Sequence, residues 1–363
     1  MTKRWNIINN IINLLLTLVS LFYVTFLALE RYNEKMFIIV LYFFLFGLFS
    51  AFVYTFIHEL GHLIGGKANG FDCLSFQVLF LRWEKQKNRF VFTLSMLGYS
   101  AGSTELVAKN TVNIEKRYKK VILSGIIFSI CIIPICLIPI FIKTLPLWLF
   151  SLLIMFLPIG VYSVLDNGLP MISEGVKNDG ALLKGLSNGD DSSKVMINLL
   201  KIQSELYNGK TPAEIDKDLY FDLPQLREDE VNFFLLLNAR YNYYLDNKDI
   251  DNAKDTIARL LSLEDYAQKS HMLIAKVDAL YSACTFNYNE EVADDLTYEL
   301  EKFINNVNTP ANLRAKLAYI QNVRKETEAL EYFYKKAIKE AKKCPISGLS
   351  KFEQKLINEL YSK

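Results

Sequence analysis

The sequence predicts an all-α membrane protein with about four transmembrane helices and a small membrane-associated β-hairpin or sheet, followed by a soluble domain of helical repeats. Two observations predict this fold class. Hydrophobic residues make up 51% of the 363 residues, and they are concentrated in the first 166, in runs long enough to cross a bilayer. After residue 180 the pattern changes to amphipathic helices rich in Glu, Lys, Asn and Tyr. We therefore expect a membrane domain in residues 1–182 and a helical domain in residues 183–363.

Four apolar runs are predicted to be spanning helices. Each is close to the roughly 20 residues that a hydrocarbon core requires, and they lie at about residues 6–29, 36–58, 118–142 and 146–166. The first follows Lys3 and Arg4, as the apolar part of a signal peptide would. Its apolar segment is too long for that, and no small-residue cleavage site follows, so we expect the helix to be retained.

Basic residues are distributed unevenly between these runs. The segment between the second and third runs is rich in Lys and Arg, whereas the link before Pro146 offers only Lys143. The positive-inside rule then places both termini and the long middle loop in the cytoplasm. The expectation is a multi-pass protein of the cell membrane whose carboxyl-terminal domain is cytoplasmic.

The middle loop contains a predicted β-hairpin region, at about residues 71–106. Residues 74–81 and 89–97 are rich in aromatic and β-branched side chains, and the polar residues 84–88 between them are typical of a turn. Residues 98–104 are small and are expected to form a third strand or a flexible edge.

The carboxyl-terminal half has a weak internal period of about 35 to 40 residues. Turns recur at residues 247–249, 287–289 and 309–310. This spacing resembles that of tetratricopeptide-type helix pairs, although the full repeat signature is absent. We expect a tetratricopeptide-like helical domain, of a kind that binds a protein partner on its concave surface.

Charge and cysteine content exclude other classes of protein. A net charge of +2 is too small for bulk attraction to nucleic acid. The cysteines are scattered, so we expect packing residues rather than a disulfide framework or a thiolate zinc site. They are Cys73, Cys131, Cys136, Cys284 and Cys344.

The strongest signal for chemistry is the motif that starts at His58, continues with Glu59 and ends at His62, at the end of the second apolar run. Residues four apart share a helix face, so both imidazoles can bind one Zn²⁺, with Glu59 beside it as the base for a water molecule. Ionisable residues in an apolar membrane helix are costly and usually functional. The motif predicts one catalytic zinc ion, whereas the third histidine, His271, is expected to be structural.

A catalytic zinc generally takes three protein ligands and keeps an open position. The best source of the third ligand is the segment after the fourth apolar run, residues 165–180. It contains two candidates, Asp166 and Asp179.

These motifs together resemble the site-2 protease family of intramembrane zinc metalloproteases, over roughly residues 36–182. The family combines a membrane-embedded HExxH motif with a later Asn-x-x-Pro and Asp-Gly, which here are Asn167, Pro170, Asp179 and Gly180. The separation of Asn167 from Asp179 is longer than in the familiar form. It is similar to that of a bacterial variant, and no PDZ-like insertion is evident.

The resemblance implies roles for individual residues. It favours Asp179 over Asp166 as the third metal ligand, with Gly180 easing the turn that aims the carboxylate. It implies that Asn167 holds the substrate strand or stabilises the oxyanion through its amide. The alternative is that Asn167 and Gly168 only end the helix.

The function implied is hydrolysis of peptide bonds in transmembrane or signal-peptide-like substrates, by water that zinc activates and with Glu59 as general base. In this interpretation the chain is a zinc metalloendopeptidase of regulated intramembrane proteolysis. The alternative is a non-proteolytic membrane scaffold, with a structural or vestigial zinc site and a partner-binding helical domain.

Overall fold

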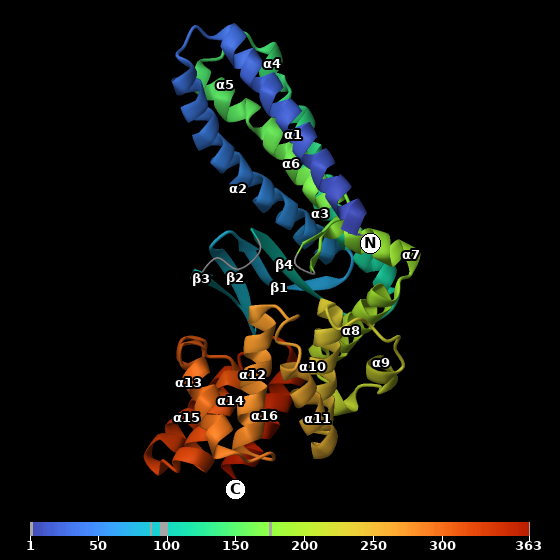
Figure 1. The fold of residues 1–363 in the computed structure, drawn as a ribbon, viewed down its shortest axis with the longest axis vertical. Coiled ribbons are helices and arrows are strands. Elements are labelled where there is room, and N and C mark those ends of the chain that lie inside the picture. The colour runs from blue at the N-terminus through green and yellow to red at the C-terminus, as the bar shows by residue number, and fades with distance from the viewer. Residues whose placement is uncertain (1–2, 88, 95–100, 174–175, 363) are drawn as a thin grey trace. The chain divides into compact units, whose positions relative to one another are not determined.

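The computed structural model describes residues 3–87, 89–94, 101–173 and 176–362. They are mostly helical and form two compact units (Figure 1). The first unit contains residues 1–84, 90–106 and 113–190, and the second contains residues 85–89, 107–112 and 191–363.

The helices of the first unit confirm the expectation of four spanning segments. The segments that are long and apolar enough are Arg4–Arg31, Met36–Ala68, Ile114–Phe141 and Leu147–Gly168. The helices are α1 Lys3–Arg31, α2 Met36–Ala68, α3 Ile114–Cys136, α4 Ile138–Phe141, α5 Leu147–Ile154, α6 Phe156–Gly168 and α7 Asp179–Asn188.

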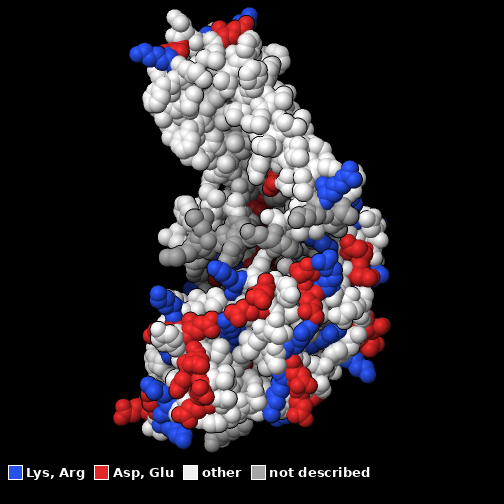
Figure 2. All heavy atoms as spheres, in the orientation of Figure 1, with Lys and Arg blue, Asp and Glu red and all other residues white. Residues whose placement is uncertain are grey.

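The outer surface of these helices is apolar. Large side chains such as Phe22, Phe37 and Phe44 are exposed by 75%, 74% and 63%. Figure 2 shows the same surface as a broad uncharged band, with charged residues gathered at the end of the bundle where α1 joins α2. A continuous apolar surface of this size is unfavourable in water and suits contact with lipid.

Helix α2 is longer than the sequence predicted. It continues beyond residue 58 to Ala68, and it ends where the side-chain amide of Asn69 donates to the carbonyl of Gly65 (2.8 Å). The predicted end was wrong because it followed the end of the apolar run, whereas a helix needs only continuous backbone bonding. The motif therefore lies inside a helix with two more turns beyond it.

The middle loop forms a four-stranded sheet with the strand order β3-β2-β1-β4. The strands are β1 Phe71–Val78, β2 Leu81–Gln86, β3 Arg89–Leu94 and β4 Gly102–Ala108. The sheet confirms a small antiparallel structure in this region. The expected third strand is β4, which pairs with β1, so it forms an edge of the sheet.

The predicted boundaries within the sheet were wrong. Residues 74–81 were expected to be one strand, but the chain turns at Leu79 (φ 50°), and Val78 pairs with Leu81 across that turn. The expected turn at residues 84–88 begins as part of β2. Residues 88 and 95–100, which include parts of the predicted second and third strands, lie outside the described residues.

A second, two-stranded sheet lies between α6 and α7. It consists of β5 Ile172–Ser173 and β6 Val176–Lys177, which are antiparallel, with Ile172 opposite Lys177. This short hairpin connects the end of the fourth apolar segment to Asp179, the first residue of α7.

The second unit is built from helix pairs. After α8 Asp191–Tyr207, η1 Pro212–Glu214 and α9 Asp218–Phe221, the helices are α10 Val231–Asp246, α11 Ile250–Leu261, α12 Lys269–Cys284, α13 Glu290–Asn306, α14 Pro310–Tyr319, η2 Ile320–Arg324, α15 Thr327–Ala341 and α16 Ser347–Tyr361. Helix α10 packs on α11, α12 on α13 and α14 on α15.

Arg314 is the largest fully buried side chain of this unit. Its guanidinium donates to Asp278 (Nη2 to Oδ1, 2.9 Å) and lies 3.0 Å from Glu353 Oε2. These residues belong to α14, α12 and α16. The buried cation and its two carboxylates therefore link three helices of the unit.

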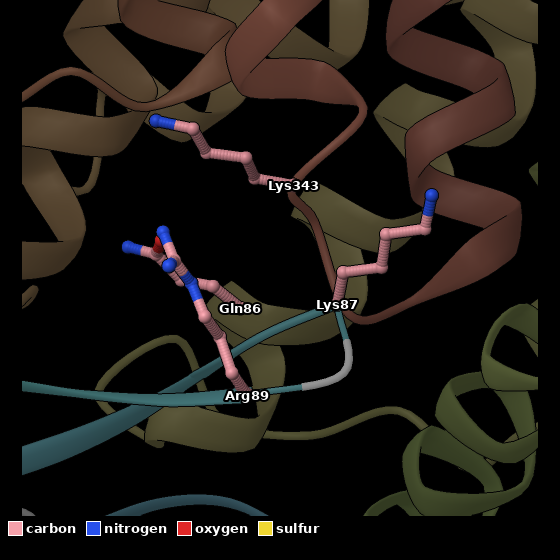
Figure 3. A pocket seen from close by; sticks show the side chains of 4 residues that line it. All are labelled: Gln86, Lys87, Arg89 and Lys343. Carbon is pink, nitrogen blue, oxygen red and sulfur yellow. The ribbon is translucent and has the colours of Figure 1, made fainter.

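Residues 85–89, at the β2–β3 turn, belong to this second unit. The Lys87 amide donates to the carbonyl of Lys343 (2.9 Å), and these two residues line an open pocket with Gln86 and Arg89. Figure 3 shows that the Lys87 side chain points away from those of Gln86 and Arg89. The backbone of Lys87 is thus bound directly to that of Lys343.

Candidate metal centre and active site

Three side chains from two distant helices converge in the first unit. The Nε2 atoms of His58 and His62 lie 3.0 Å apart, and Asp179 Oδ2 lies 3.1 Å from the first and 3.0 Å from the second. Among the described residues, this is the group of His, Cys, Asp and Glu side chains arranged to hold a metal ion. The structure therefore brings the motif on α2 together with the start of α7.

Helix α3 fixes the orientation of both imidazole rings. His62 Nδ1 donates to the carbonyl of Val121 (2.9 Å), since a carbonyl oxygen only accepts. Ser129 Oγ donates to the carbonyl of Gly125, so it is free to accept from His58 Nδ1 at 3.2 Å. With Nδ1 protonated in both rings, the neutral imidazoles present their Nε2 lone pairs to the shared centre.

Space for the His62 ring depends on Gly125. A β-carbon built at this position would meet the Cε1, Nε2 and Cδ2 atoms of His62. Glycine is required here for the close approach of α3 to the ring. Helix α3 therefore determines where the candidate ligand atoms of the two histidines lie.

The donor set fits a metal cation. Asp179 is a carboxylate at neutral pH, which is the ordinary state of an aspartate side chain. Its Oδ2 atom is buried and accepts no ordinary hydrogen bond. Two lone pairs and a carboxylate oxygen within about 3 Å repel one another unless a positive charge lies among them. A tetrahedral zinc ion separates its ligand atoms by roughly 3.3 Å, close to the separations here.

Asp179 is held in place by its neighbour Asn178, which caps α7. The Asn178 Oδ1 atom accepts from the amides of Ala181 and Met171, both at 2.9 Å. Its Nδ2 group donates to the carbonyls of Leu169 (2.7 Å) and Asp166. One carboxamide thus joins the first turn of α7 to the end of α6 and fixes the position of Asp179, the candidate ligand.

Gly180 was expected to ease a turn that aims the carboxylate of Asp179, and that reason was wrong. Gly180 lies in the first turn of α7 and is absent from the glycines with positive φ. A β-carbon there would lie 2.8 Å from the carbonyl carbon of Gly168 and 2.9 Å from that of Leu169. Glycine is needed because α7 begins against the backbone at the end of α6, not because a turn requires its conformational freedom.

The other two candidates from the sequence lie differently. Asp166 is not part of the converging group, and its backbone carbonyl accepts from Asn178. The Asn167 amide donates to the carbonyl of Ser163, four residues earlier in α6 (2.9 Å). Helix α6 ends one residue later, at Gly168, which agrees with the alternative interpretation of Asn167 and Gly168.

Glu59 is buried and is held by the edge strand β4. Its side chain is 7% exposed, and its Oε2 atom accepts from Thr104 Oγ1 at 2.6 Å. A β-carbon at Gly102 would lie 2.7 Å from Glu59 Oε1, so β4 packs directly on the carboxylate. No sequence pattern distinguishes Thr104 beyond its place in the small-residue segment 98–104.

The third histidine lies in the second unit. His271 stacks on Phe234, with ring centroids 5.6 Å apart, and burial lowers its pKa. This packing agrees with a structural role. Among the cysteines, Cys73, Cys136 and Cys284 are buried, whereas Cys131 is exposed.

Comparison with known proteins gives one finding. The model of Peptidase family M50 matches residues 43–340, which is most of the chain. No curated protein and no solved structure matches this chain. The matched region contains all three converging side chains, Glu59 and Thr104, and it begins after α1.

Proposed function

Because this chain belongs to peptidase family M50, the site-2 protease family of membrane metalloproteases, we propose that it is an intramembrane zinc endopeptidase that cleaves transmembrane or signal-peptide-like substrates. The observation that carries the proposal is the convergence of His58, His62 and Asp179 beside a buried Glu59. The motif lies within a candidate span, Met36–Ala68. A zinc site with a purely structural role could lie anywhere in the protein. A position inside a membrane span is needed only where the site must reach a substrate in the membrane.

His58 Nε2, His62 Nε2 and Asp179 Oδ2 are the atoms that would hold the zinc ion. Bound zinc supplies a Lewis acid and lowers the pKa of the water that attacks the peptide carbonyl. Glu59 accepts the proton of that water at its carboxylate and passes it to the leaving amine. Thr104 is a positioning residue, because its hydroxyl fixes one oxygen of Glu59 and leaves the other to act as the base.

Asn167 is the proposed contact for the substrate strand or the oxyanion. Its amide would have to leave the Ser163 carbonyl to make that contact. Asn167 would lose its hydrogen bond to Ser163 within α6 and gain one to the substrate. The backbone of an unwound substrate lacks the hydrogen bonds of a helix and can accept from this amide. Asn167 would then act only when a substrate is bound.

Orientation and partners belong to the same proposal. We propose that both termini and the β-sheet lie on the cytoplasmic side, an orientation supported by the distribution of basic residues. It would give the site access to the water that hydrolysis consumes. The helix pairs that begin at Val231, Lys269 and Pro310 support a repeat-like, tetratricopeptide-type domain. Such a domain would recruit a protein partner or present a substrate.

Removing the metal is expected to lower cleavage of a tagged membrane substrate by at least about 100-fold, since a Lewis acid supplies several kcal/mol of transition-state stabilisation. The measurement compares the purified full chain before and after chelation, with zinc content verified at each stage. Adding back one equivalent of Zn²⁺ is expected to restore the rate, whereas Mg²⁺, which prefers oxygen ligands, is not. Undiminished cleavage by verified zinc-free protein would rule out the proposed chemistry.

Replacing Thr104 with Val is expected to lower the cleavage rate about tenfold or more, because a hydrogen bond to a charged group contributes about 1.5–3 kcal/mol. Zinc affinity is expected to stay the same, since Thr104 contacts Glu59 and none of the three ligands. Ser103→Ala is the matched control: it lies one residue earlier in β4 and faces the opposite side of the strand. Equal rates for T104V and wild type would show that Glu59 does not depend on this hydroxyl.

A further inference from the structure

Helix α1 contains polar residues that neither the motif nor the family match explains. Asn6, Asn9 and Asn13 recur at helical spacing near its start, and Asn13 is only 3% exposed. All three lie in the candidate span Arg4–Arg31. Carboxamides in a membrane helix are costly unless they find hydrogen-bond partners, so their partners indicate what the helix does.

Two of these side chains bind the backbone of the segment that leads to Asp179. Asn6 Nδ2 donates to the carbonyl of Ile172 (2.8 Å), and the Ile172 amide donates back to Asn6 Oδ1 (2.7 Å). Asn9 Nδ2 donates to the carbonyl of Pro170 (2.7 Å). The carboxamide of Asn6 thus pairs with both backbone groups of Ile172, as a neighbouring strand would.

The same segment is held on its other side by Asn178. Met171, between Pro170 and Ile172, exchanges hydrogen bonds with Asn178: its amide donates to the side chain, and its carbonyl accepts from the Asn178 amide (3.1 Å). Asn178 directly precedes Asp179. The segment 170–172 is therefore fixed between α1 and Asn178, the cap of α7. Asn178 is the residue next to Asp179, the proposed third ligand.

We propose that Asn6 and Asn9 are positioning residues for the metal centre, so that the first membrane helix sets the affinity of the site through the segment 170–172 and Asn178. This inference rests on the proposed function, because it assumes that Asp179 is a metal ligand. It assigns a role to a helix that lies outside the matched residues 43–340. Helix α1 also packs along α6 (Figure 1), which keeps both asparagines facing the segment.

Packing alone would be a different role for the same residues. If the asparagines only joined α1 to the bundle, their loss would lower the stability of the metal-free protein and leave zinc affinity unchanged. If they position Asp179, zinc affinity falls, because outer partners of ligands typically contribute 10–100-fold. The two roles therefore separate in measurements that do not involve cleavage.

The test uses the full chain in detergent, with Zn²⁺ alone as the probe in competition with a chelator, and with Co²⁺ absorption as a report on ligand geometry. The double variant Asn6→Ala/Asn9→Ala is expected to bind Zn²⁺ about tenfold more weakly or worse and to shift the Co²⁺ bands. Asn10→Ala is the matched control. Asn10 is an exposed asparagine of the same helix, and within the described part of the chain its side chain donates to the carbonyl of Asn6 alone. Its loss is expected to change neither reading.

Unchanged zinc affinity and unchanged Co²⁺ bands in the double variant would overturn the inference, whatever its unfolding temperature. If the double variant does not fold, Asn9→Ser decides by the same criterion, since it removes only the donation to Pro170. Failure of the proposed function looks different. In that case the wild-type chain itself would bind no Zn²⁺ at the site, and His58→Ala would change nothing.

Discussion

Replacing Glu59 with Gln is expected to lower cleavage of a membrane substrate by about 10²–10⁴-fold, the usual contribution of a general base, while zinc stays bound. Glutamine has the same shape and still accepts from Thr104 Oγ1, so the surroundings of the side chain are preserved. It cannot take a proton from water at neutral pH. The measurement is the rate of processing of a tagged substrate by wild type and E59Q, with zinc content determined on the same samples.

The zinc content provides the internal control for this comparison, because a variant that had lost its metal would be inactive for another reason. Equal processing by wild type and E59Q would refute catalysis by Glu59. It would also favour the rival function, a membrane scaffold whose zinc site is structural. With the expected result, E59Q becomes a trap, and substrates that copurify with it can be identified by mass spectrometry.

Replacing Asp179 with Ala is expected to weaken zinc binding by more than roughly 100-fold, the upper end of the effect of losing an outer partner, and to abolish cleavage. The physical reason is that Asp179 Oδ2 lies 3.1 Å and 3.0 Å from the two Nε2 atoms and completes the ligand set. Zinc affinity is measured directly, by competition with a chelator of known affinity. The result does not depend on knowing the substrate.

Asp166→Ala is the matched control for this variant. Asp166 was the competing candidate from the sequence, and its contact with Asn178 uses the backbone carbonyl, which the substitution retains. Zinc affinity is expected to be unchanged. A loss of zinc in the Asp166 variant and none in the Asp179 variant would reverse the assignment of the third ligand.

The general class of the fold was predictable because it depends on simple quantities. The number of spanning segments follows from the length of apolar runs, and the motif on α2 follows from helical spacing. The candidate third ligand was not determined by the sequence alone, because Asp166 at the end of the fourth apolar run and Asp179 after it were both available. The choice between them depends on the hydrogen bonds of Asn178, which bring the start of α7 to the end of α6.

The errors have similar physical origins. The first turn of the sheet is formed by Leu79 and Phe80, without the Gly, Asn or Pro that usually mark a turn. Thr104 and Ser129, whose hydroxyl groups contact Glu59 and His58, were also missed. A hydroxyl group in a small-residue segment or an apolar helix has no pattern that distinguishes such a contact from ordinary packing.

In the proposed endopeptidase, the contacts between α3 and the two imidazoles restrict how a substrate can enter. Val121, Gly125 and Ser129 are spaced by four residues along one face of α3, and all three contact the rings or make room for them. Turning α3 by a single residue, roughly 100°, would remove all three contacts at once. Opening movements that keep the ligands aligned must therefore treat α2 and α3 as one rigid body, which leaves the other elements of the first unit to move aside.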